Sequence, residues 1–192
     1  MLNVIYVPGL GDKRPYGQVL ITKCWRLFGL RAYYLALDWA NDEPFESKLT
    51  RLVAKIDELA KDGPVSLVGV SAGAGAVLNA YALRPNIKSV VLICGKVQHP
   101  ETINPSYFER NPAFKSSAFM VAGSLAKLSN LQRARIMSIR PLSDQTVPPN
   151  HTIVPGAVAK VVGSHGHIQS IYYTIIFKPK LIASFLKSQT EV

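Results

Sequence analysis

The hydrophobic positions of this chain follow two patterns that alternate along its length. Residues 65–70 form a short, almost entirely apolar run, whereas residues 44–62 place apolar side chains three or four positions apart. The first pattern is typical of a strand buried on both faces, and the second predicts an amphipathic helix. The predicted strands are 3–7, 31–37, 65–70, 87–94, 134–139 and 157–162, and the predicted helices are 16–28, 44–62, 72–83, 116–128 and a closing helix over 168–187 interrupted at Pro179.

Strands that alternate with helices in this way predict a parallel sheet with helices on both faces. We therefore expect one α/β domain over residues 1–192, with a mostly parallel central sheet of about six strands. A chain of this length buries a substantial core, and it shows no internal repeat, linker or low-complexity tract. Ligands of such sheets bind beyond the carboxyl ends of the strands.

Composition supports a globular chain, because 48% of the residues are hydrophobic and 18% are charged. The N-terminus lacks the basic start and long apolar stretch of a signal peptide, and no run approaches the ~20 apolar residues of a transmembrane segment. We therefore expect a soluble, cytoplasmic protein. Cys24 and Cys94 lie in separate apolar elements, so we expect buried, reduced thiols rather than a disulfide or a metal site.

The formal net charge is +10, and it is unevenly distributed. Residues 63–192 hold 13 of the 22 basic side chains but only 4 of the 12 acidic ones. A field of one sign attracts an anionic substrate or an acidic surface, although solubility alone also accounts for such an excess. The basic residues are dispersed and accompany no nucleic-acid-binding motif, so no nucleic-acid partner is expected.

The segment Gly69-Val70-Ser71-Ala72-Gly73 joins the predicted strand 65–70 to the predicted helix 72–83. G-x-S-x-G between a strand and a helix is the pattern of a nucleophile elbow, in which a strained turn exposes the serine hydroxyl. The helix that follows would present backbone N–H groups where an oxyanion forms. The segment lacks the lysine of a P-loop, and no cofactor is implied.

Four features in order give the chain its resemblance to the small α/β-hydrolases. They are Pro8-Gly9-Leu10-Gly11 after the first strand, the elbow at Ser71, Asp144 in Asp144-Gln145-Thr146-Val147-Pro148, and a late histidine in Gly163-Ser164-His165-Gly166-His167. The resemblance spans nearly the whole chain and keeps the family order of serine, aspartate and histidine. It implies an α/β-hydrolase fold with a short cap inserted near residues 97–133.

The resemblance also implies roles for particular residues. Ser71 would be the nucleophile and Asp144 the acid that orients the base, with Glu101 as the alternative acid because some hydrolases take it from that position. The oxyanion hole would use the backbone N–H groups of Leu10 and Ala72. Pro-Gly stands before Leu10 where many relatives have His-Gly, which removes a side chain that often braces this loop.

Two histidines compete for the role of base. Ser164-His165-Gly166-His167-Ile168 fits the family pattern of Gly-His followed by an apolar residue, which favours His167, and His165 is the alternative. A metal site at this pair is not expected, because no nearby Cys, Asp or Glu completes a tetrahedral set.

The implied activity is that of a serine hydrolase, carboxylesterase-like, which cleaves a small acyl ester through an acyl-enzyme without a cofactor. Thioesterase, lipase and acyltransferase activities use the same intermediate and stay open as alternatives. A noncatalytic binding protein on the same fold is the alternative from another class. The motifs leave open the acyl group, the leaving group and the oligomeric state.

Overall fold

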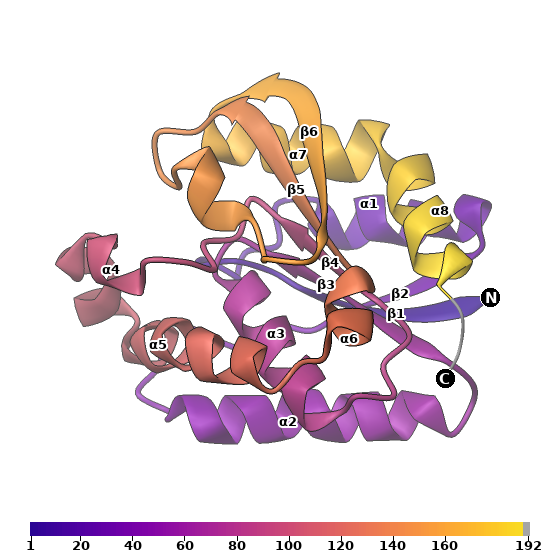
Figure 1. The fold of residues 1–192 in the computed structure, drawn as a ribbon, viewed down its shortest axis with the longest axis horizontal. Helices are drawn as coiled ribbons and strands as arrows, with labels where there is room; N and C mark the ends of the chain where they lie inside the picture. The colour runs from indigo at the N-terminus through magenta and orange to yellow at the C-terminus, as the bar shows by residue number, and fades with distance from the viewer. Residues whose placement is uncertain (190–192) are drawn as a thin grey trace.

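A computed structural model describes residues 1–189 and contains one six-stranded sheet. The strand order is β2-β1-β3-β4-β5-β6, and every pair of neighbours is parallel (Figure 1). The parallel sheet predicted from the apolar runs is therefore confirmed. The strands are β1 (Leu2–Val7), β2 (Leu30–Tyr34), β3 (Val65–Val70), β4 (Val90–Ile93), β5 (Ile136–Ser143) and β6 (Val158–His165).

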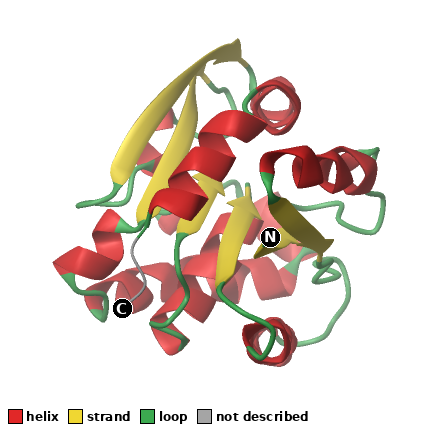
Figure 2. Ribbon diagram, turned by 90° about the vertical axis from the view of Figure 1, so that its right-hand side faces the viewer, coloured by secondary structure: helices red, strands yellow, loops and turns green. Residues whose placement is uncertain are grey.

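Helices cover both faces of this sheet, as Figure 2 shows from the side. Alternate side chains of a strand point to opposite faces, so Ile5 and Val7 of β1 belong to one core cluster and Val4 and Tyr6 to the other. The first cluster packs against α2, α3 and α5, and the second against α7 and α8. The helices are α1 (Gln18–Lys23), α2 (Phe45–Ala60), α3 (Gly73–Leu83), α4 (Pro105–Arg110), α5 (Pro112–Ala126), α6 (Asn130–Ala134), α7 (His167–Phe177) and α8 (Pro179–Ser188), with short 3₁₀ helices η1 (Cys24–Phe28), η2 (Pro100–Thr102) and η3 (Pro149–Thr152).

The boundaries of several helices differ from the prediction. The helix expected over 16–28 is α1 followed by η1, and the chain turns out of η1 at Gly29 in a left-handed conformation. The closing helix is two helices, because Pro179 cannot continue α7 but fits the first turn of α8. The predicted burial of Cys24 is wrong, because the neighbouring Trp25 takes the buried position and Cys24 is exposed.

Residues 97–133 form two parts, one packed against the body of the molecule and one that projects from it. α5 packs against α3, where the amide of Asn79 donates to the Ser117 carbonyl at 3.0 Å and accepts from the Ser124 hydroxyl at 2.7 Å. α4 projects from the body of the molecule (Figure 1). The interpretation of this insertion as a cap therefore rests on η2 and α4. None of the helices within residues 1–189 has the length and apolar character needed to cross a bilayer.

Candidate active site

Ser71 occupies the sharp turn between β3 and α3. Its φ is 51°, in the left-handed region, which costs a non-glycine residue free energy and is favoured only where the surroundings impose it. Two backbone hydrogen bonds impose it here. The Ser71 N–H donates to the Ile93 carbonyl of β4 at 2.9 Å, and the Ser71 carbonyl accepts from the Ala74 N–H at 3.1 Å.

The glycines of the motif allow the chain to approach itself closely around this turn. A Cβ on Gly73 would lie 2.3 Å from the Val7 carbonyl oxygen, and one on Gly69 would lie 2.5 Å from the Val77 side chain. A Cβ on Gly9 would lie 2.8 Å from the Cβ of Ser71. These three glycines therefore lie where the turn at Ser71, the end of β1 and the start of α3 approach too closely to admit another side-chain carbon.

Ser71, His167 and Asp144 form a continuous chain of hydrogen bonds. The Oγ of Ser71 lies 2.8 Å from Nε2 of His167, and Nδ1 of the same ring lies 2.7 Å from Oδ2 of Asp144. Asp144 directly follows β5, and His167 begins α7 directly after β6, so neighbouring strands deliver both groups. The Asp144 side chain is fully buried and that of His167 is 8% exposed, so little water competes for these bonds.

The surroundings of Asp144 favour the ionised form of its carboxyl group. Burial alone raises its pKa, but the hydrogen bond from His167 and those from the Val147 and Thr146 amides act in the opposite direction, and the pKa ends below its ordinary value. A carboxylate only accepts, so Nδ1 of His167 carries the proton that it donates. In the neutral ring Nε2 is then free to accept the hydroxyl proton of Ser71.

The two alternatives from the sequence lie in other hydrogen-bonded groups. Nδ1 of His165 is 2.8 Å from the Ser143 hydroxyl. Glu101 lies on η2, exposed, with its carboxylate 3.1 Å from Nδ1 of His99. His165 and Glu101 therefore lie outside the hydrogen-bonded group of Ser71, His167 and Asp144.

A cleft of about 630 Å³ opens above Ser71 and His167 at the carboxyl ends of the strands. Leu10 and Ala72, the predicted oxyanion-hole residues, both line it. Ala72 precedes the first residue of α3, and backbone amides at a helix start have no acceptor within the helix. The lining residues are Gly9, Leu10, Gln18, Val70, Ser71, Ala72, Lys96, Thr102, Ile103, Asn104, Tyr107, Phe114, Gln145, Thr146, Val147, His167, Ile168, Ile171 and Tyr172.

The loop that carries Leu10 is hydrogen-bonded to the segment that follows β2. Oδ2 of the buried Asp12 accepts from the Leu37 and Asp38 amides at 2.7 and 2.6 Å. The Trp39 indole donates to the Pro8 carbonyl at 3.3 Å. These bonds tie the loop after β1 to the segment after β2 on both sides of Leu10.

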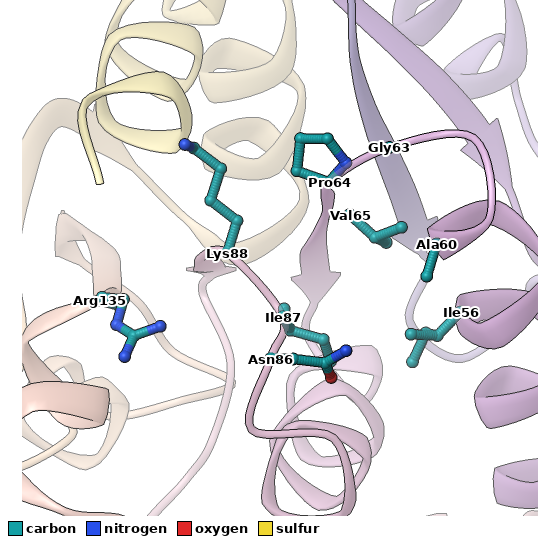
Figure 3. A pocket seen from close by; sticks show the side chains of 9 residues that line it. All are labelled: Ile56, Ala60, Gly63, Pro64, Val65, Asn86, Ile87, Lys88 and Arg135. Carbon is teal, nitrogen blue, oxygen red and sulfur yellow. The ribbon is translucent and has the colours of Figure 1, made fainter. Parts of the chain in front are cut away.

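Figure 3 shows a second cavity, of about 330 Å³, at the opposite edge of the sheet, where β3, β4 and β5 begin. Its lining includes Lys88 and Arg135 but no serine, cysteine, histidine or carboxylate among the described residues. Among the described residues, no hydroxyl, thiol, imidazole or carboxylate group of those residue types therefore faces this cavity. Residues 1–189 also contain no cluster of three His, Cys, Asp or Glu side chains arranged for a metal ion.

Several residues of the first cleft were not identified from the sequence, notably Gln18, Lys96 and Tyr172. Lys96 carried a usable signal, because it follows the apolar run at 87–94 and so stands near the carboxyl end of a predicted strand. No such signal marks Gln18 or Tyr172. Both lie within predicted helices, and the apolar pattern of a helix does not distinguish an exposed position from one that faces a cleft.

Comparison with protein-family models and with curated proteins finds no match for this chain. Solved structures do match. The monoacylglycerol lipase of Paleococcus ferrophilus is 16% identical with a TM-score of 0.66, and the match covers 98% of this chain and 95% of that one. The esterase domain of a Rhodothermus marinus protein is 15% identical with a TM-score of 0.68, covering 95% and 85%. The ydeN gene product of B. subtilis is 15% identical with a TM-score of 0.67, covering 98% and 100%.

These likenesses concern the fold. The chain has the α/β-hydrolase fold in a small form, as its motifs predicted, and the match extends over nearly its whole length.

Proposed function

We propose that this protein is a serine hydrolase that cleaves small acyl esters, with Ser71 as nucleophile, His167 as general base and Asp144 as the acid that orients it. The observation that carries the proposal is the chain of hydrogen bonds of 2.8 and 2.7 Å that joins these three side chains at the cleft. A serine hydroxyl becomes an effective nucleophile only beside such an oriented base.

In the first half of the reaction, the Oγ of Ser71 attacks the ester carbonyl carbon while Nε2 of His167 takes the hydroxyl proton. The carbonyl oxygen becomes an oxyanion and accepts hydrogen bonds from the Leu10 and Ala72 amides. Asp144 stabilises the imidazolium. The imidazolium then gives its proton to the leaving alcohol as the C–O bond breaks, and the acyl group stays on Ser71.

In the second half, a water molecule takes the place of the alcohol. His167 removes a proton from the water, whose oxygen attacks the acyl carbon. Collapse of the second oxyanion breaks the bond to Ser71, and the proton on His167 returns to the serine oxygen. The products are a carboxylic acid and an alcohol, and no cofactor takes part.

The same acyl-enzyme would serve a thioesterase or an acyltransferase, and a noncatalytic protein could keep the fold. The left-handed backbone of Ser71 costs stability, and Asp144 is held ionised against His167, and both features favour a reactive site over a packing role. The Paleococcus and Rhodothermus proteins are named as a lipase and an esterase, which favours an ester as the substrate.

A fluorophosphonate probe tests the proposal, because it phosphonylates only an activated serine. The wild type should be labelled and should hydrolyse short para-nitrophenyl esters. Ser71→Ala should lose both, with turnover reduced at least about 10⁴-fold. Ser184→Ala, which removes an exposed hydroxyl of α8, is the matched control and should keep both.

Two results would contradict the proposal. One is labelling of a correctly folded Ser71→Ala variant at the wild-type level. The other is a folded wild type that neither reacts with the probe nor hydrolyses esters, which would favour a binding protein. Addition of a second alcohol during turnover distinguishes hydrolysis from acyl transfer, since a transferase would form the new ester.

A further inference from the structure

Among the described residues that line the active-site cleft, Lys96 is the one Lys, Arg, Asp or Glu side chain. The remaining lining consists of apolar residues, neutral polar residues and His167, with no Asp, Glu or Arg. The lining of the cleft therefore provides one cationic side chain and no carboxylate. A ligand that fills the cleft meets one positive charge.

The position of Lys96 is set by the strand beside the nucleophile. β4 is the neighbour of β3 in the sheet, and the chain leaves β4 through Cys94 and Gly95 before it reaches Lys96. A Cβ on Gly95 would lie 2.1 Å from the Cβ of Ala74 and 3.3 Å from the Ser71 carbonyl oxygen. The backbone one residue before Lys96 therefore packs directly against the elbow.

The Lys96 ammonium group is held by two uncharged acceptors. It donates to the hydroxyl of Thr102 on η2 and to Nδ1 of His151 on η3, the latter at 3.0 Å. His151 accepts at Nδ1 because an ammonium group can only donate. An ammonium group has three hydrogens, so these two contacts leave one for a ligand in the cleft.

No carboxylate among residues 1–189 forms an ion pair with Lys96. Glu101 is near enough for its charge to be felt, but it bonds to His99 instead. The half-buried Lys96 side chain thus keeps a charge that is partly desolvated and that no ion pair within residues 1–189 compensates, and burial lowers its pKa. An uncompensated cation of this kind is stabilised when an anion binds beside it.

We propose that Lys96 selects substrates, and that the preferred esters of this enzyme carry a carboxylate on their acyl or alcohol portion. The inference rests on the proposed function, since the cleft it describes is the one above Ser71. The net charge of +10 acts in the same direction by drawing anions toward the molecule. Lys96 is a specificity-determining residue in this scheme, and Ser71, His167 and Asp144 carry the chemistry.

Two pairs of matched esters test the proposal and separate the acyl side from the alcohol side. The acyl pair is mono-para-nitrophenyl glutarate and para-nitrophenyl valerate, which have similar length and differ in a terminal carboxylate. The alcohol pair is para-acetoxybenzoate and its methyl ester. The measured quantity is the ratio of kcat/KM for the charged ester to that for the neutral one, after correction for the alkaline hydrolysis rate of each.

In Lys96→Met, which keeps the length of the side chain without its charge, this ratio should fall about tenfold or more for one pair. Lys96→Arg retains the cation and should keep most of the wild-type preference. Lys127→Met removes an exposed lysine at the end of α5, so it changes the net charge equally and should leave the ratio unchanged.

An unchanged ratio in Lys96→Met for both pairs would overturn the inference, as would an equal fall in Lys127→Met, which would assign the preference to the overall field. These results differ from failure of the proposed function. In that case the fluorophosphonate probe would not label Ser71 and neither member of either pair would be hydrolysed, and both proposals would fall together.

Discussion

His165 and His167 are separated by one glycine, yet their rings bond to different partners. Nε2 of His167 lies 2.8 Å from the Ser71 hydroxyl, whereas Nδ1 of His165 lies 2.8 Å from the Ser143 hydroxyl. Gly166 between them has φ 79° and ψ 154°, a conformation that other residues rarely adopt. β6 ends at His165 and α7 begins at His167, so the chain changes direction at this glycine.

This separation predicts opposite results for the two histidines. His167→Ala should lower ester turnover by about 10³-fold or more and abolish fluorophosphonate labelling, because it removes the proposed base. His165→Ala should change turnover by less than about fivefold, since its ring bonds to Ser143 rather than to Ser71 or Asp144. Steady-state kinetics of both variants, with circular dichroism as the control for folding, checks this. A larger loss in His165→Ala would reassign the base.

The close approach of Gly73 to β1 gives a prediction about stability. In Gly73→Ala the new Cβ would lie 2.3 Å from the Val7 carbonyl oxygen, a backbone atom that can move only by distorting the sheet. We expect a loss of at least about 2 kcal/mol in the free energy of unfolding. Urea denaturation measures it.

Gly123→Ala is the control for that variant. Gly123 lies in the helix α5, and a Cβ there would meet nothing within 4 Å. The change should stabilise the protein by about 0.5–1 kcal/mol, because alanine favours the helix over the unfolded chain. Equal effects of the two substitutions would mean that the turn at Ser71 tolerates a side chain on Gly73.

The lowered pKa of Asp144 predicts how its contribution to stability depends on pH. The folded state holds this pKa below the ordinary 3.8, so the unfolded chain binds the proton more readily. The contribution is therefore fully present above about pH 3.8 and is lost as the pH falls through the lower, folded-state value. Between pH 6 and pH 3, the free energy of unfolding should fall more steeply for the wild type than for Asp144→Asn. Parallel curves would show that Asp144 is not held ionised.

The pattern of apolar residues predicted the sheet well because parallel strands are buried on both faces. The run at 65–70 coincides with β3 residue for residue. The pattern predicted helix ends less well, since the break at Pro179 and the turn at Gly29 depend on single residues. The apolar stripe of one continuous α-helix places Cys24 in the core, but the chain passes into the 3₁₀ helix η1 at Cys24, and Trp25 takes the buried position.

The predictable part of the candidate site is the part marked by motifs that occur in the expected order along the chain. Ser71 and Asp144 stand in recognisable motifs at strand ends, and the structure brings them together. The orientation of the imidazole and the hydrogen-bond partners of Lys96 were not predictable, because both depend on contacts between distant segments. His167 meets Asp144, 23 residues away, and Lys96 meets His151, 55 residues away.

The two cysteines differ in environment, and this predicts a difference in reactivity. Burial, and then the nearby charge of Asp144, raises the pKa of Cys94 from 9.0 to about 12, whereas Cys24 is exposed. At pH 9 only about one Cys94 in a thousand is a thiolate, the form that iodoacetamide alkylates. Peptide mapping after alkylation at pH 9 should therefore find Cys24 modified and Cys94 unmodified, with both modified in urea.

Asp144→Asn provides the sharper test of the cause. Removal of the charge leaves Cys94 buried but takes away one of the two effects that disfavour its thiolate, so alkylation of Cys94 should be faster than in the wild type. Cys24 in the same sample is the internal standard, because its rate should not change. An unchanged Cys94 rate would mean that burial alone protects this thiol, and rapid modification of Cys94 in the folded wild type would contradict its position beside the carboxylate.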